Sequence, residues 1–348
     1  MTMTTISPAM PIYSSTHSVA LRMTQVSYLE MNLAAPEIAS WQELLPSSCD
    51  WCPRACHANR RGGEAGFCGA SNTMRIARAA LHFWEEPPLS GTTGSGAVFF
   101  SGCTLRCVFC QNASIAAGQV GKEVTPARLQ EIFFELRAQG ALNINLVTPT
   151  HYAPLIAHVA VHAQEQGFDL PFVWNTSGYE TRGALQVIAP VANVFLTDFK
   201  YASPTLSQQL SHAANYPEIA LSALDTMVEI TGEPCFDEYH GQVRMTRGVV
   251  VRHLLLPGQV SDSCAVVELL HKRYGARILL SLMNQYTPVL SATSAAAQKF
   301  PELLCAPTER EYEQLLNFAD ELGIQDYFWQ QGGAVDESFI PSFDLTGV

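Results

Sequence analysis

Residues 97–112 read AVFFSGCTLRCVFCQN, and this stretch decides how the rest of the chain can be interpreted. It opens with an apolar run of strand length, and three cysteines follow at a C-x3-C-x2-C spacing. Thiolates at this spacing can wrap one loop around three corners of an iron–sulfur cubane, whereas electron-transfer clusters close all four corners with cysteine. The fourth iron is then open to a substrate or cofactor. Simpler explanations are three thiols buried in a core, or a zinc site that borrows a fourth ligand.

Beyond this stretch, short apolar segments alternate with amphipathic helical segments. Strands are predicted at residues 97–100, 143–147, 172–174, 194–196, 249–255, 278–282 and 327–329. Helices are predicted after an N-cap at Thr125 and at about 153–166, 182–189, 217–230, 261–274 and 308–322. This alternation predicts an α/β fold with a parallel sheet, and the number of units suggests a partial (βα)6 barrel. Ligands should then sit at the carboxyl ends of the strands.

The composition excludes several classes of protein. The chain has 348 residues, of which 47% are hydrophobic and 15% charged, and its net charge is −12. This balance is too apolar for an intrinsically disordered chain. No apolar run approaches the roughly 20 residues of a membrane-spanning helix. No block of Lys and Arg could follow a phosphate backbone, so we expect neither a nucleic-acid partner nor a membrane one.

We predict three regions along the chain. Residues 1–44 lack periodicity and are expected to be a poorly ordered extension, 45–75 a Cys-rich metal-binding module, and 76–348 the barrel with a C-terminal tail. Residues 91–96 read GTTGSG. They precede a strand and contain no lysine, unlike a phosphate-binding loop. We expect them to form a turn that supports the cysteine loop.

The ten cysteines point to bound metal. Seven of them fall in two tight sets and three are isolated. A disulfide framework is typical of short secreted chains, and the first residues lack the basic, apolar and small-residue segments of a secretory leader. We therefore expect reduced thiols in a cytoplasmic protein.

The first of these sets, here named the N-terminal set, consists of Cys49, Cys52, Cys56 and Cys68. Its segment is too short to form a core, so it needs a metal to fold. Four thiolates suit either a structural zinc ion or a second 4Fe–4S cluster, and the spacing alone does not choose between them. A redox-active thiol set is the third alternative. Neighbouring arginines could offset the charge of an anionic cluster.

The second set, here named the barrel set, consists of Cys103, Cys107 and Cys110. Its motif, directly after the first strand of an α/β barrel, resembles that of the radical S-adenosylmethionine (SAM) superfamily, and the aromatic Phe109 fits the same pattern. The resemblance implies a 4Fe–4S cluster on these cysteines, whose open iron chelates SAM. It also implies reductive cleavage of SAM to a 5′-deoxyadenosyl radical, hydrogen abstraction from a substrate, and an electron donor such as flavodoxin or ferredoxin.

Further segments resemble the pyruvate formate-lyase-activating enzymes. Residues 175–178, 198–200 and 252–258 are similar to their Asp-Thr-Asn-Gly, Asp-Leu-Lys and Arg-Tyr-Val-Val-Val-Pro-Gly segments. The resemblance implies that Asn175, with its neighbour Thr176, and Asp198 bind the SAM amine or ribose. It implies that Lys200 and Arg252 hold the SAM carboxylate, for which arginine offers a bidentate fork.

One departure from that family follows the second predicted strand. The family usually places Gly-Gly-Glu there, whereas residues 148–151 read TPTH and contain no carboxylate. Hydroxyl and carbonyl groups could accept the hydrogen bonds of the SAM amine instead. His151 is a candidate acid or base on the substrate side, although a lone histidine is more often structural.

The stretch from about residue 45 to 348 resembles a branch known as the PflX-like proteins. The similar segments are CPRAC at 52–56, NINLVTPTH at 143–151, NQYTP at 284–288 and ESFIPSFD at 337–344. The name of the branch implies activation of a glycyl-radical enzyme, hence a protein substrate and an open barrel mouth. The alternative is a small-molecule radical SAM enzyme, favoured if the tail from about 332 to 348 closes the mouth. A third hypothesis is a non-catalytic Fe–S or zinc protein.

Overall fold

The computed structural model describes residues 3–5, 41–330 and 341–348. Within them, one sheet has the strand order β1-β11-β10-β9-β7-β6-β5-β3-β2-β4, and β8 pairs with β9 as a hairpin. The strands are β1 (Met3–Thr5), β2 (Met74–His82), β3 (Ser95–Phe100), β4 (Lys122–Val124), β5 (Ile144–Val147), β6 (Phe172–Thr176), β7 (Val194–Asp198), β8 (Cys235–Tyr239), β9 (Gln242–Leu254), β10 (Leu279–Met283) and β11 (Tyr327–Gln330).

The central strands confirm the predicted α/β class. The strands β3, β5, β6, β7, β9, β10 and β11 lie side by side in chain order, and each pair of neighbours is parallel. All residues of β3 and β5 are buried, as expected for parallel strands covered on both faces. The edges β1, β2 and β4 are antiparallel. Among the described residues the two edges do not pair with each other, so the sheet is open, as in a partial barrel.

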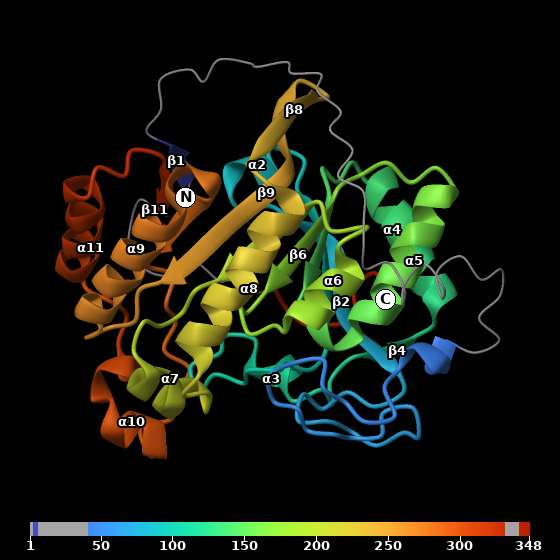
Figure 1. Ribbon diagram of the computed structural model, residues 1–348, viewed down its shortest axis with the longest axis horizontal. Coiled ribbons are helices and arrows are strands. Elements are labelled where there is room, and N and C mark those ends of the chain that lie inside the picture. The colour runs from blue at the N-terminus through green and yellow to red at the C-terminus, as the bar shows by residue number, and fades with distance from the viewer. Residues whose placement is uncertain (1–2, 6–40, 331–340) are drawn as a thin grey trace.

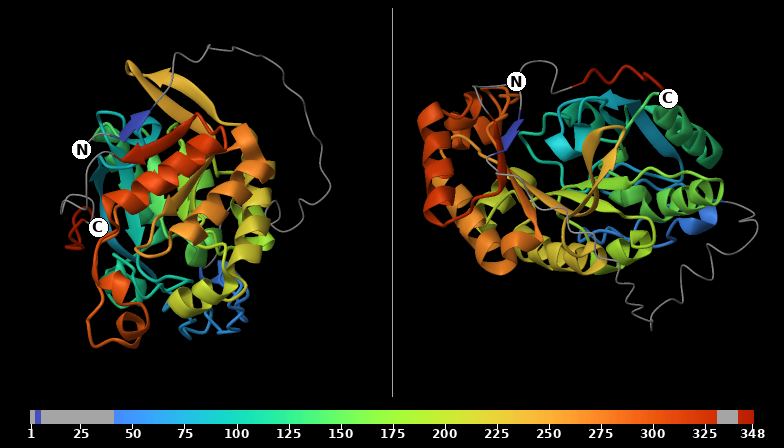
Figure 2. Two further views of the ribbon diagram at one scale, coloured as in Figure 1. Left: turned by 90° about the vertical axis from the view of Figure 1, so that its left-hand side faces the viewer. Right: turned by 90° about the horizontal axis from the view of Figure 1, so that it is seen from above.

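Helices surround the outer face of this curved sheet (Figure 1, Figure 2). The helices of the described residues are α2 (Pro87–Ser90), α3 (Ala113–Ala116), α4 (Pro126–Ala138), α5 (Ala153–Glu165), α6 (Arg182–Ile188), α7 (Pro204–Ser211), α8 (Tyr216–Thr231), α9 (Val260–Tyr274), α10 (Ala295–Lys299) and α11 (Glu309–Glu321). Four short 3-10 helices are η1 (Trp41–Leu44), η2 (Thr150–Tyr152), η3 (Gly275–Arg277) and η4 (Pro301–Leu304). Within the described part of the chain, no helix has both the length and the apolar character needed to cross a membrane.

The start of α4 confirms a local prediction. The Thr125 side chain accepts a hydrogen bond from the amide of Arg128, and proline occupies the first helical turn. The predicted apolar face is buried and consists of Leu129, Ile132, Phe133 and Leu136.

Other local predictions were incomplete or wrong. The predicted strands omit β1, β2, β4 and β8. The alanine-rich β2 has no strong strand pattern of its own, and it becomes a strand by pairing with β3 on one side and β4 on the other. Within the segment predicted to be a poorly ordered extension, residues 3–5 form a strand and 41–44 a 3-10 helix. Residues 6–40 of that extension lie outside the described residues.

The glycine-rich residues 91–96 do not support the cysteine loop. They lie before β3, whereas the cysteines follow its other end. The amide of Thr92 donates to Oε1 of Gln242, at the start of β9, over 2.6 Å. The turn therefore joins the amino ends of two strands, and the expected role is corrected.

The segment that carries the N-terminal set has turns and bends but neither helix nor strand between residues 45 and 73. Its loops lie at the lower end of the molecule in Figure 1, beside α3. This is the end at which the parallel strands terminate and the barrel-set loop begins.

Candidate functional site

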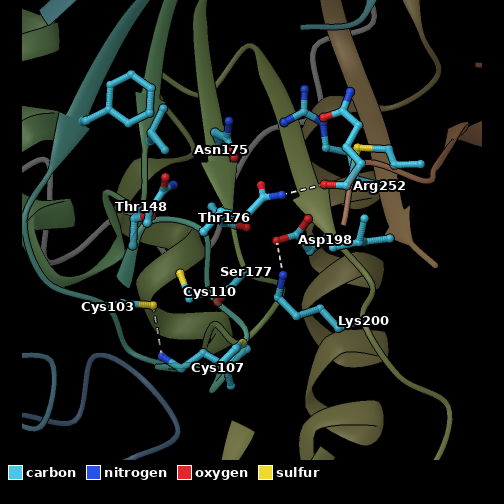
Figure 3. Close-up of a pocket in the computed structure, with 18 of the residues that line it drawn as sticks. Cys103, Cys107, Cys110, Thr148, Asn175, Thr176, Ser177, Asp198, Lys200 and Arg252 are labelled. Carbon is cyan, nitrogen blue, oxygen red and sulfur yellow. Dashed lines mark hydrogen bonds and ion pairs between the residues drawn. The ribbon is translucent and has the colours of Figure 1, made fainter. Parts of the chain in front are cut away.

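A cavity of about 230 Å³ lies at the carboxyl ends of the parallel strands. The barrel set lines one side of it, and polar side chains from successive strand ends line another (Figure 3). These polar residues are Thr148, Asn175, Thr176, Ser177, Asp198, Lys200 and Arg252. The structure therefore brings together the three cysteines and the five residues that the sequence resemblance had assigned to SAM.

The barrel set occupies the loop between β3 and α3. The amides of Leu105 and Arg106 point at Sγ of Cys103, over 3.4 and 3.5 Å. Burial, together with repulsion from the other two thiols, raises the pKa of Cys110 to about 12. A free Cys110 thiol would therefore be protonated, whereas the amides aimed at the sulfur of Cys103 fit a metal-bound thiolate. The loop residues fit a cluster that leaves one iron open.

A second donor reaches this set from α7. The Ser211 hydroxyl donates to Sγ of Cys107 over 3.0 Å, and its oxygen lies 2.7 Å from the hydroxyl oxygen of Tyr201. Ser211 and Tyr201 are fully buried. Hydrogen bonds to cluster sulfurs are one of the means by which a protein sets a cluster's reduction potential.

Asp198 and Lys200 form an ion pair on the cavity wall. Asp198 ends β7, and its Oδ2 lies 2.6 Å from Nζ of Lys200. Burial alone would lower the pKa of the Lys200 ammonium, but the Asp198 carboxylate and the nearby thiol of Cys107 raise it, so it stays protonated. An acid and a cation side by side can serve the amino and carboxylate groups of an amino-acid ligand.

The matched family decides what this cavity belongs to. Residues 97–258 match the model of the radical SAM superfamily, and this segment contains both the cysteine loop and the polar strand ends. Over this segment the chain is similar to the radical SAM superfamily. Its cofactors are therefore a 4Fe–4S cluster and SAM. The family model describes the superfamily as a whole and carries no preference for activating enzymes.

Several other proteins are similar to this chain. An uncharacterised protein of Methanocaldococcus jannaschii is 25% identical over 310 residues, 86% of this chain and 82% of its own length. A second from that organism is 26% identical over 157 residues, 40% of this chain and 46% of its own length. A radical SAM methyltransferase from Sphaerobacter thermophilus has a TM-score of 0.47 and 15% identity, with 68% of this chain and 67% of that chain covered. Streptococcus suis SuiB, bound to its precursor peptide SuiA, has a TM-score of 0.46 and 13% identity, with 66% and 46% covered.

Arg252 has partners that the resemblance did not imply. Its Nε and Nη2 donate to the two carboxylate oxygens of Glu86 over 2.7 and 2.6 Å, and Nη2 also donates to Glu85. Asn145 donates to the other oxygen of Glu85 over 2.7 Å. The bidentate fork predicted for the SAM carboxylate thus already holds Glu86. Arg252 lines the cavity as part of a buried network.

His151 lies outside the cavity wall, which corrects its candidate role on the substrate side. Its side chain is buried, and Nε2 lies 2.8 Å from the carbonyl oxygen of Ser101. Burial and the nearby Arg60 lower the pKa of His151 to about 3. The imidazole is neutral at physiological pH and braces the backbone behind the barrel-set loop.

A carboxyl group that no sequence motif marks lies near the strand end where the family's usual one is absent. Glu180 follows β6, and its Oε1 accepts a hydrogen bond from the Thr150 hydroxyl over 3.1 Å. Its Oε2 is buried without a hydrogen-bond partner. Burial raises the pKa of Glu180 to about 7. No local pattern marks this glutamate, because it comes from a different strand end than the one that lacks a carboxylate.

Substitution of Glu180 by glutamine should stabilise the protein above pH 7. Because the folded-state pKa of Glu180 is raised, its contribution to stability is fully present below the unfolded pKa and is lost as pH rises through about 7. The amide cannot ionise. The free energy of unfolding of Glu180→Gln should exceed that of wild type by up to about 3 kcal/mol at pH 8, and the two should converge below pH 5. Urea unfolding at both pH values measures the difference.

The matched control for this experiment is Glu313→Gln, which removes an exposed carboxyl on α11. This variant should follow the wild-type pH dependence. If the stability of Glu180→Gln showed the same pH dependence as that of wild type, the raised pKa of Glu180 in the folded protein would be contradicted.

The N-terminal set is gathered near the barrel set. Cys49, Cys52 and Cys68 are buried, and Cys56 is exposed. A Cβ added to Gly66 would stand 3.2 Å from Sγ of Cys56 and 3.6 Å from Sγ of Cys68. The thiols of Cys56 and Cys68 therefore both pack against the backbone at Gly66, where a side chain would crowd them.

Proposed function

We propose that Cys103, Cys107 and Cys110 hold the 4Fe–4S cluster of a radical SAM enzyme and that the adjoining cavity holds SAM and the substrate. When bound, the cluster supplies the electron that splits SAM into methionine and a 5′-deoxyadenosyl radical, and this radical removes a hydrogen atom from the substrate. The strand ends orient the ligands, and burial of the cavity excludes water from the radical.

The observation that carries this proposal is the shared cavity. The barrel set and the Asp198–Lys200 pair line the same space. An amino-acid moiety placed between them would meet a carboxylate for its amine and an ammonium for its carboxylate. Asn175 and Thr176, one strand away, extend the polar wall on which the ribose would lie. Arg252 acts indirectly, because its guanidinium is occupied by Glu85 and Glu86.

The C-terminal tail favours a small-molecule substrate. Pro341 lines the cavity, and the Phe343 ring packs against that of Phe99, with centroids 5.5 Å apart. Asp344 forms an ion pair with Arg78 on β2 over 2.8 Å. Pro341 therefore stands at the cavity while Phe343 and Asp344 pack beside β3 and β2, and residues 331–340 of the tail lie outside the described residues. Activation of a glycyl-radical enzyme, a cytoplasmic location and a flavodoxin or ferredoxin donor stay predictions.

Formation of 5′-deoxyadenosine tests the proposal. The full-length protein is reconstituted anaerobically with iron and sulfide and mixed with SAM and dithionite. We expect 5′-deoxyadenosine by chromatography and a SAM-dependent change in the EPR signal of the reduced cluster. A loaded, reducible cluster that neither cleaves SAM nor changes its signal would favour the non-catalytic Fe–S hypothesis instead.

Substitution of Ser211 by alanine should lower the reduction potential of this cluster by up to roughly 100 mV. The Ser211 hydroxyl donates to Sγ of Cys107 and so stabilises the more negative, reduced state. A hydrogen bond to a charged group contributes about 1.5–3 kcal/mol, and about 59 mV corresponds to a tenfold change for a one-electron couple. An EPR-monitored redox titration measures the shift.

The control is Ser207→Ala. Ser207 is equally buried on the same helix, but its hydroxyl donates to the Pro204 carbonyl over 3.0 Å. Its loss should leave the potential unchanged. Equal shifts in both variants would mean that the hydrogen bond to Cys107 does not set the potential.

A further inference from the structure

The N-terminal set lies directly against the barrel set. The amide of Cys103 donates to the carbonyl oxygen of Cys68 over 3.2 Å, so one hydrogen bond joins a residue of each set. Glycines allow this approach. A Cβ on Gly102 would stand 2.7 Å from that same carbonyl oxygen, and a Cβ on Gly69 would stand 2.2 Å from the carbonyl oxygen of Ala117. The contact therefore depends on positions where any side chain would force the two loops apart.

Arg54 links the loop of the N-terminal set to the barrel-set loop. Its guanidinium lies between the rings of Phe67 and Tyr179, 4.3 and 5.2 Å from their centroids. It donates to four carbonyl groups, two in the barrel-set loop and two at the end of α7, which belong to Thr104, Leu105, Ser211 and His212. A residue between Cys52 and Cys56 thus supports both the barrel-set loop and the helix that delivers Ser211 to Cys107.

Arg60 indicates that the N-terminal set is anionic. It is fully buried, and its Nη2 has no hydrogen-bond partner. Its guanidinium interacts electrostatically with Cys49 and Cys68. Neutral thiols would leave a buried cation uncompensated, which is strongly destabilising. Four thiolates on a metal centre would supply the missing negative charge.

The position of the N-terminal set favours a 4Fe–4S cluster over zinc. Both groups accept four thiolates. A zinc ion carries no electrons, whereas a second cluster could exchange them with a cluster on the barrel set. The backbone contact of Cys68 with Cys103 would place such a group beside the barrel set.

We propose that the N-terminal set holds a second 4Fe–4S cluster that passes electrons to the barrel set through the contact of Cys68 with Cys103. Cys56 is exposed, and Cys68 is buried in contact with Cys103, so Cys56 would be the ligand nearer solvent and Cys68 the ligand nearer the barrel set. This inference rests on the function proposed for the barrel set.

The transfer is a one-electron step. A reduced low-potential flavodoxin or ferredoxin gives one electron to the second cluster and is itself oxidised. The second cluster then reduces the barrel-set cluster by one electron and returns to its oxidised state. No covalent bond forms or breaks, and no proton moves. Cys56 marks the entry side for the donor and Cys68 the exit side.

The test uses the Cys52→Ala/Cys56→Ala double variant. Three remaining thiols would equal the number that the barrel set offers to a cluster, whereas two would be too few. Iron should fall from about eight to about four ions per chain. The SAM-dependent EPR change of the barrel-set cluster should remain. Reduction of that cluster by reduced flavodoxin, followed by stopped-flow absorbance, should slow at least about tenfold. Reduction by dithionite, a small reductant that can enter the cavity, should remain.

Two results would overturn the proposal. One is a wild-type protein with one tightly bound zinc and about four irons per chain. The other is a Cys52→Ala/Cys56→Ala variant whose barrel-set cluster is reduced by flavodoxin at the wild-type rate although iron is lost. Failure of the function proposed for the barrel set would give a different experimental result. Both clusters would load and exchange electrons in wild type, but SAM would be neither bound nor cleaved.

A second variant tests the contact itself without removing a ligand. Arg54→Met should keep about eight irons per chain and slow reduction of the barrel-set cluster by flavodoxin about tenfold. The matched control is Arg61→Met, because Arg61 lies in the same segment but donates to Leu45 and Glu43, away from the barrel set. Equal rates in the two variants would contradict a relay through this contact.

Discussion

Replacement of Cys107 by alanine should abolish 5′-deoxyadenosine formation, down to the level of a mixture without protein. Cys107 is the middle member of the barrel set, and its Sγ receives the Ser211 hydroxyl. Without this thiolate the loop offers only two protein ligands to a cluster that requires three. We expect the loss to appear both in chromatography of the reaction with SAM and dithionite and in the iron content of the reconstituted protein.

Cys264→Ala is the matched control for this prediction. Cys264 is a half-buried cysteine on α9, remote in sequence from both cysteine sets. Its loss should leave iron content and 5′-deoxyadenosine formation unchanged. Cleavage of SAM by Cys107→Ala at the wild-type rate would remove the barrel set from the proposed mechanism.

Replacement of Arg252 by methionine should lower the free energy of unfolding by about 3–5 kcal/mol, the usual cost of breaking a buried ion pair. Arg252 is the shared partner of Glu85 and Glu86, whose side chains are 6% and 0% exposed. Beside Arg252 the pKa of Glu85 is held below its ordinary value despite its burial. The variant would leave two buried carboxylates close together without a cation. Urea unfolding at constant pH measures the change.

Arg273→Met supplies the comparison, because the Arg273–Asp225 pair is exposed. Its loss should cost no more than about 1 kcal/mol. The double variant Arg252→Met with Glu86→Gln should recover part of the stability, since one uncompensated charge is removed. A cost for Arg252→Met as small as that for Arg273→Met would show that the buried network does not stabilise the fold.

The local pattern of the chain was sufficient for the fold class and for the position of the site. Alternating apolar strands and helices predicted a parallel sheet because each element buries its own face with its own period. The cysteine motif could be recognised because its three ligands lie within one loop. Asn175, Asp198 and Lys200 reach one cavity because parallel strands in chain order end at the same edge.

Local pattern failed where a partner is distant in the chain. The antiparallel β2 depends on pairing with β3 and β4, and its alanines gave no strand signal of their own. Arg252 and Glu86 are 166 residues apart, and only the register of β9 against its neighbours brings them together. His151 and Glu180 lie at strand ends like the cavity residues, yet the first is turned to Ser101 and the second to Thr150.

The sequence by itself therefore determined the class of the sheet, the edge that carries the site and the motif that marks the family. The tertiary structure alone decided which charges are already paired, which titratable groups are buried, and that Cys68 touches Cys103. The physical reason is the distance along the chain over which each effect acts. Periodicity, capping and motif spacing act over a few residues, whereas burial and pairing depend on the packing of segments that are distant in the chain.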